Sequence, residues 1–106
     1  MKTNNLYGSL HLTIEDAKTL LEKKLNIKFD PKDSFYHGDY YRYGKDDAEN
    51  FLLKKNFDPL DGEPVEMKFP DYSILLYVNH TNRSLELSNL FNKEPLNISL
   101  LRQQNS

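Results

Sequence analysis

Between residues 14 and 25 the apolar positions recur about every 3.6 residues, which is typical of an amphipathic helix. Thr13 stands where an N-cap is expected, Asn26 stands where a C-cap is expected, and Pro31 prevents a longer helix. Acidic residues open the segment and lysines close it, which suits the helix dipole. The apolar stripe consists of Ile14, Ala17, Leu20 or Leu21, and Leu25. We expect this stripe to lie on a sheet.

After the helix the period changes to two, which indicates strands. Residues 39–43 and 49–55 predict a hairpin joined by a turn over 44–47. Residues 72–78 form a nearly continuous apolar run, which is typical of a central strand covered on both faces. Residues 57–64 contain two prolines and a glycine and predict a loop.

The pattern is weaker toward both ends. Residues 84–91 are compatible with a short helix or with a strand, and residues 97–101 predict a short apolar element. We expect residues 1–10 and 102–106 to be flexible. The predicted architecture is α+β, as a single domain over residues 1–106. An N-terminal helix packs on a small antiparallel sheet of three to four strands, followed by a short C-terminal element.

Composition narrows the class of protein. The 106 residues include no cysteine, so disulfides and thiolate metal sites are excluded. No segment approaches the roughly 20 apolar residues that span a bilayer, and the first residues do not resemble a signal peptide. We therefore expect a cytoplasmic protein without a membrane partner.

The charge distribution is uneven although the net charge is only −2. Residues 30–71 contain eleven acids and six bases, a net charge of −5, whereas the rest of the chain is +3. Nucleic-acid surfaces need clustered lysine and arginine. An acidic middle segment therefore argues against direct nucleic-acid binding and suits a basic protein partner.

Candidate chemistry is sparse. The three histidines are not at metal-ligand spacing, and no nucleophile or phosphate-loop motif is present. We predict no metal, no cofactor and no catalytic residues. The segment 58–62 superficially resembles a calcium loop, but a proline turn explains it better. One enzyme alternative remains, in which His37 acts as a base beside Asp39.

The segment SFYHGDYYRYG, residues 34–44, concentrates four of the seven tyrosines. On a strand, Tyr41 and Tyr43 share a face with Asp39, while Tyr40 shares the other face with Arg42. One set can pack in the core while the other faces solvent. Tyrosine is common in strands, but exposed tyrosine is also enriched at protein interfaces.

Three segments resemble small immunity proteins of bacterial contact-dependent growth inhibition and related polymorphic toxin systems. They are TIEDAKTLLEKKLNIKF, SFYHGDYYRYG and DPLDGEPVEMKFPDYSILLYVN, and the resemblance covers roughly residues 13–80. It implies a non-catalytic cytoplasmic protein that binds the C-terminal domain of a cognate toxin, commonly a nuclease. The family implies no particular binding residues.

The sequence hypothesis is therefore an immunity protein that neutralises a toxin domain through an acidic, tyrosine-bearing surface, as a monomer rather than a homo-oligomer. Carboxylates would steer the partner and tyrosines would supply buried area. The alternative is a non-catalytic regulatory or structural interaction module, such as a homodimer through an open sheet edge. The predicted toxin contacts are Asp39, Tyr40, Tyr43, Asp46, Asp47, Asp58, Asp61 and Glu63.

Overall fold

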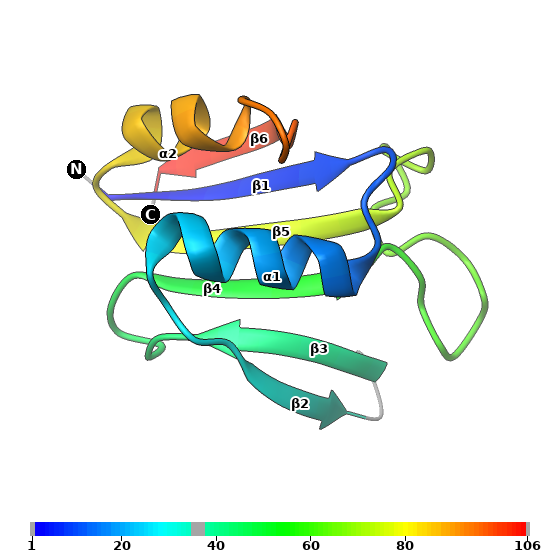
Figure 1. Cartoon of the computed structure of the whole chain (residues 1–106). Helices are drawn as coiled ribbons and strands as arrows, with labels where there is room; N and C mark the ends of the chain where they lie inside the picture. Colours follow the sequence, from blue (N-terminus) through cyan, green and yellow to red (C-terminus); the bar gives the residue numbers. More distant parts are fainter. Residues whose placement is uncertain (1, 35–37, 106) are drawn as a thin grey trace.

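The computed structural model describes residues 2–34 and 38–105. Within these ranges the chain forms one antiparallel sheet of six strands in the order β2-β3-β4-β5-β1-β6, together with two helices (Figure 1). In chain order the elements are β1 (Thr3–Ser9), α1 (Ile14–Leu25), β2 (Asp30–Ser34), β3 (Gly38–Tyr43), β4 (Asn50–Lys55), β5 (Ile74–Thr81), α2 (Ser84–Phe91) and β6 (Ser99–Asn105).

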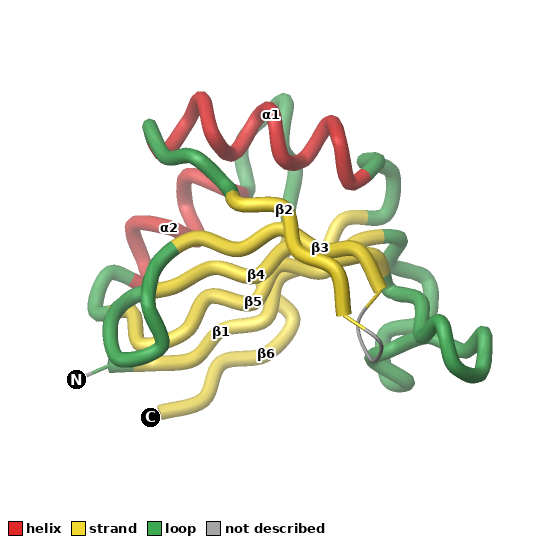
Figure 2. Tube along the Cα trace, turned by 90° about the horizontal axis from the view of Figure 1, so that it is seen from below, coloured by secondary structure: helices red, strands yellow, loops and turns green. Residues whose placement is uncertain are grey.

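Both helices lie on the same face of the curved sheet (Figure 2). The main core fills the space between the helices and this face of the sheet. Strand residues alternate between faces, so Tyr7, Leu53 and Leu76 face the helices and are buried. The helices contribute Ala17 and Leu21 from α1, and Leu87 and Phe91 from α2. The rings of Tyr7 and Phe91 meet edge to face, with centroids 5.0 Å apart.

Helix α1 begins and ends where the sequence predicts. The Thr13 hydroxyl accepts a hydrogen bond from the Asp16 amide, at 3.1 Å, and so satisfies a donor at the N-terminus. Asn26 adopts the left-handed conformation, with φ 55°, that ends many helices. The predicted hairpin is also present as β3 and β4, with Tyr41 opposite Leu53 and Tyr43 opposite Phe51.

The predicted fold class, a helix on a sheet of three to four strands, is wrong because the sheet has three further described strands. Residues 3–9, expected to be flexible, form β1 in the sheet interior between β5 and β6. Residues 99–105 form β6, although 102–106 were expected to be flexible. Residues 30–34 form the edge strand β2. Residues 84–91, for which two structures were open, are helical.

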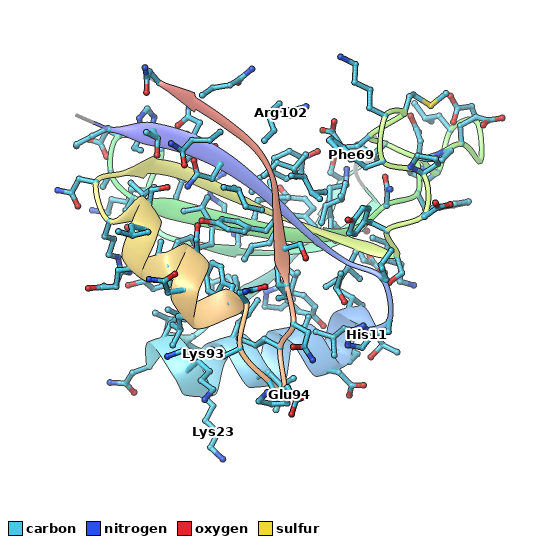
Figure 3. The ribbon with its side chains drawn as sticks, turned by 90° about the horizontal axis from the view of Figure 1, so that it is seen from above. His11, Lys23, Phe69, Lys93, Glu94 and Arg102 are labelled. Atoms are coloured by element: carbon cyan, nitrogen blue, oxygen red, sulfur yellow. The ribbon has the colours of Figure 1, made fainter. Side chains whose placement is uncertain are left out.

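Part of the second face of the sheet is covered by the segment between β4 and β5. We call residues 56–73 the covering loop. Its organising residue is Asn56, whose amide nitrogen donates to the Phe69 and Tyr72 carbonyls and whose oxygen accepts from the Glu66 amide. Phe69 and Arg102 lie on this side of the sheet, opposite the helices (Figure 3). On this face of the sheet, Leu6 and Leu75 are buried.

Candidate functional site

The tyrosines of β3 divide between the two faces as predicted. Tyr41 and Tyr43 face the helices and pack against the core. Tyr43 stacks on Phe51, with ring centroids 5.6 Å apart, and this predicted contact residue is half-buried. Tyr40 lies on the other face opposite Lys54 and is also half-buried. The two predicted tyrosines therefore do not share one surface.

A pocket of about 380 Å³ opens between the start of α1 and the β2–β3 edge of the sheet. Three carboxylates line it, from Glu15 on α1, Asp33 on β2 and Asp39 on β3. Tyr41 also lines the pocket and donates a hydrogen bond to Glu15, at 2.5 Å. This hydrogen bond, together with burial and the charges of Glu15 and Asp39, raises the pKa of the Tyr41 hydroxyl. Tyr41 is therefore neutral at physiological pH.

The pocket exists because the helix layer is narrower than the sheet. Six strands at about 4.8 Å spacing span more than 20 Å, whereas two helices packed 8–10 Å apart cover less. The contacts of α1 with the sheet centre on β4, so the helix-side surface of β2 and β3 extends beyond the helix (Figure 1). Charged side chains can remain on this uncovered extension, whereas the part of the same face under the helices is apolar.

Asp33 and Asp39 lie directly opposite each other in the β2–β3 ladder, and both are exposed. Side chains that face each other in such pairs have Cβ atoms about 5 Å apart, and two like charges at this position are destabilising. Lys32 and Lys55 also line the pocket, yet they take part in no ion pair with Asp33 or Asp39 among the salt bridges of the described residues. A cationic group from outside would relieve this repulsion.

The acids of the covering loop lie at the same end of the sheet. Pro59 is next to Gly38, the first residue of β3, since a Cβ built there would lie 3.6 Å from Pro59. The loop is ordered by its own acids, because Asp58 accepts from the Leu60 amide and Asp61 accepts from the Glu63 amide, each at 2.9 Å. We call the group formed by the pocket and these loop residues the acidic end; it consists of Glu15, Asp33, Asp39, Asp58, Asp61 and Glu63.

Apolar side chains stand among these carboxylates. Phe57 is 53% exposed and Leu60 is 54% exposed, although both are large hydrophobic residues. Met67, farther along the covering loop, is also exposed. Exposed apolar groups gathered on an ordered loop and rimmed by charge are typical of protein interaction sites.

The two remaining predicted contacts are elsewhere. Asp46 and Asp47 lie in the turn between β3 and β4, at the opposite end of the hairpin from Gly38. A six-residue strand is roughly 20 Å long, so this turn is about that far from the acidic end. Asp46 forms an ion pair with Arg42. The eight predicted residues therefore do not form one continuous surface.

His37 lies outside the described residues, so its predicted pairing with Asp39 has no description in the structure. Within residues 2–34 and 38–105 no group of three or more His, Asp or Glu side chains is placed to hold a metal ion.

Sequence reasoning missed a polar cluster under the covering loop. The Glu66 carboxylate accepts a hydrogen bond from Tyr77, at 2.5 Å, and pairs with Arg102 at 3.1 Å. Burial acts to raise the pKa of Glu66, but the hydrogen bonds from Tyr77 and Arg102 and the charges of Arg102 and Lys54 outweigh it, so the pKa is lowered. Glu66 thereby ties the covering loop to β5 and β6 while ionised. No sequence spacing signals this cluster, because its residues come from three distant segments.

Lys54 is the other unusual member of this face. Its side chain is buried, with 3% of the residue exposed, and burial lowers its pKa against the opposing effect of Asp58 and Glu66. The alternation of β4 places Lys54 on the face opposite Leu53, which the sequence indicates, but its burial depends on the covering loop.

No protein-family model and no curated protein matches this chain. Neither helix of the described chain has the length and apolar character required to cross a membrane.

Proposed function

We propose that the chain is an immunity-type protein that binds a basic toxin domain in the cytoplasm and neutralises it one to one, without catalysis. The observation that supports this best is the facing pair Asp33 and Asp39 in an acidic pocket beside exposed Phe57 and Leu60. The resemblance of residues 13–80 to immunity proteins points to the same class.

The acidic end has the parts that a tight interface uses. A lysine or arginine side chain of the partner fits the pocket, where it would meet Glu15, Asp33 and Asp39. Charge-assisted hydrogen bonds of this kind are stronger than neutral ones. Phe57 and Leu60 would supply apolar anchors next to it. The same carboxylates would steer a basic cleft toward this surface before contact.

Repulsion between Asp33 and Asp39 gives a test that separates binding from folding. In the free protein, Asp33→Asn should raise the free energy of unfolding by about 0.2–1 kcal/mol, because it removes a like-charge pair. In the complex the same change should weaken binding, since a cation loses a partner. A variant that is more stable yet binds less tightly indicates a functional carboxylate.

The direct experiment purifies the chain and the domain encoded by the neighbouring gene, tests whether that domain is a toxin, and measures their association by stopped flow. We compare Asp58→Lys/Asp61→Lys, at the acidic end, with Asp46→Lys/Asp47→Lys, in the β3–β4 turn. The two variants make the same change in net charge. We expect the first to slow association at least tenfold and to lose protection, and the second to change association much less.

Equal slowing in both variants would mean that only total charge matters, and an unchanged rate in the first would exclude the acidic end. Failure of the wild-type chain to bind or inhibit the toxin domain would overturn the proposal itself.

A second candidate, a homodimer that pairs through a sheet edge, is favoured by one observation. The described edge strand β2 carries Pro31 and three charged residues, which discourage strand pairing. The other edge strand, β6, carries only one charged residue, Arg102, and no proline. Light scattering after size exclusion tests this candidate, because Leu101→Pro in β6 should convert such a dimer to a monomer.

A further inference from the structure

Two neighbouring hollows lie between the C-terminal part of α1 and the segment that runs from α2 to residue 95. The first has a volume of about 400 Å³ and the second about 350 Å³. Lys24 lines both, so the hollows adjoin on either side of this side chain. We call the pair the interhelix groove. Each hollow is of the size that binds a large side chain or a small ligand.

The floor of the interhelix groove is apolar. In the first hollow it is formed by Leu25, Leu87 and Leu90, and in the second by Leu20 and Pro95. Leu20, Leu25 and Leu90 are only partly buried, at the border of the core. A partner that covers them would remove further apolar surface from water, which is favourable by about 25 cal/mol per Å².

The rim of the groove is basic. Lys23, Lys24 and Lys93 are exposed and line it, and Lys23 and Lys93 lie near each other on the helix side of the molecule (Figure 3). Within the part of the chain that the structure describes, none of the three forms a salt bridge. On α1 the reason is spacing: the residues three and four positions from Lys23 and Lys24 include no acid.

The acids near the groove already have partners or lie outside it. Glu86 lines the first hollow but pairs with Arg83, which is itself held by Glu49. Glu22 faces Lys18 and accepts from the Phe29 amide. Glu94 follows Lys93 and lies near it (Figure 3), but it lines neither hollow. The groove therefore presents three lysine charges on a chain whose net charge is −2.

We propose that the interhelix groove binds an acidic amphipathic helix of a partner protein. Such a helix would place apolar residues, spaced i, i+3 or i+4, and i+7, into the two hollows, and its carboxylates beside the lysines. The structure disfavours nucleic acid, because an apolar floor offers no hydrogen-bond donors to phosphate oxygens. It disfavours a membrane surface, because the leucines lie in hollows and not on a projecting face.

This inference does not rest on the proposed function. The acidic end is at the first turn of α1 and the interhelix groove at its last turns, and a helix of 12 residues is about 18 Å long. The chain thus has two surfaces of opposite charge at the two ends of one helix. Two different partners can therefore bind at the same time, one at the acidic end and one in the interhelix groove.

The test uses a defined probe, a fluorescein-labelled peptide of about 15 residues with leucine at i, i+3, i+7 and i+10 and glutamate on the opposite face. Fluorescence anisotropy measures its affinity for the full chain. The matched probe has the same composition in scrambled order, which keeps the charge but removes the apolar stripe. We expect the amphipathic probe to bind with a Kd on the order of 10 µM and at least ten times tighter than the scrambled one.

Two double variants locate the site. Lys23→Glu/Lys93→Glu reverses the rim, whereas Lys45→Glu/Lys68→Glu makes the same net change at exposed positions outside the groove. We expect at least a tenfold loss of affinity in the first and less than a twofold change in the second. Amide shifts in NMR spectra should change in residues 20–25 and 87–93 on addition of the probe.

Several results would overturn the proposal. They are no binding of the probe at about 1 mM, equal binding of the scrambled peptide, equal losses in the two double variants, or shift changes confined to other elements. Tighter binding of single-stranded DNA or of anionic vesicles than of the probe, lost in Lys23→Glu/Lys93→Glu, would instead assign the groove to that other class of partner.

Discussion

Glu66 is the residue through which the covering loop is held to the sheet, and Glu66→Gln tests this directly. The change keeps the shape of the side chain but removes its charge. Its hydrogen bond from Tyr77 is charge-assisted, a type that contributes about 1.5–3 kcal/mol. The pair with Arg102 adds less than about 1 kcal/mol, because the arginine side chain is 40% exposed.

Glutamine retains an oxygen that can accept from Tyr77, so part of this energy remains. We therefore expect a loss of about 2 kcal/mol in the free energy of unfolding, measured by urea denaturation at pH 7. For a domain of this size the corresponding fall in Tm is about 10 °C. The double-mutant cycle with Tyr77→Phe should give a coupling energy of about 1 kcal/mol.

The pH dependence provides a second readout. The folded-state pKa of Glu66 is lowered below its ordinary value of 4.5. Its contribution to stability is therefore complete above that value and is lost as the pH falls through the lowered folded-state pKa. The difference between wild type and Glu66→Gln should shrink at acidic pH. A coupling energy near zero, or a difference that is the same at acidic and neutral pH, would refute an ionised Glu66 as the tie between the loop and the sheet.

Three further predictions concern stability. Gly44→Ala should destabilise the protein by more than about 2 kcal/mol, because φ is +89° and the new Cβ would lie 2.5 Å from a backbone oxygen. Gly62→Ala, where φ is +74° but the space around the new Cβ is open, should cost only about 1–2 kcal/mol in a parallel urea titration. Leu21→Ala should lower the stability by about 2–5 kcal/mol because the side chain is fully buried, whereas Leu85→Ala, 76% exposed, should change it by less than about 0.5 kcal/mol by the same assay. Thr13→Ala removes the N-cap of α1 and should cost about 1 kcal/mol, visible as a lower thermal midpoint by circular dichroism.

Local patterns predicted the parts of the fold that depend on near neighbours. Helix α1 has a cap at each end and a regular stripe, and the β3–β4 hairpin has aromatic alternation around a turn. The strands that were missed lack these signals. Strand β1 contains two asparagines and a glycine, and β2 contains a proline and two aspartates, residues that are depleted in strands. Their pairing is decided by distant segments, which no local pattern records.

In the candidate site, too, features decided by near neighbours in the sequence were predicted, and features decided by distant segments were not. Alternation correctly separated Tyr41 and Tyr43 from Tyr40, because it depends only on position along one strand. It did not show that Asp33 would face Asp39, because β2 was not predicted. The charge count over residues 30–71 grouped Asp46 with Asp58, whereas the structure places them at opposite ends of the β3–β4 hairpin.

The position of β1 has a consequence for the order in which the molecule can assemble during synthesis. Its partners come late, since Ser9 pairs with Ile74 and Thr3 pairs with both Thr81 and Asn105. At the usual rate of about 5–20 residues per second, the ribosome needs roughly 5–20 s to make the chain between β1 and β6. During that time α1 and the β3–β4 hairpin can form from local contacts, while β1 waits as an unpaired segment. The sheet can therefore be completed only when β1 pairs with β5 and β6, which are synthesised late. Because these contacts join residues far apart in the sequence, their formation is expected to limit the folding rate.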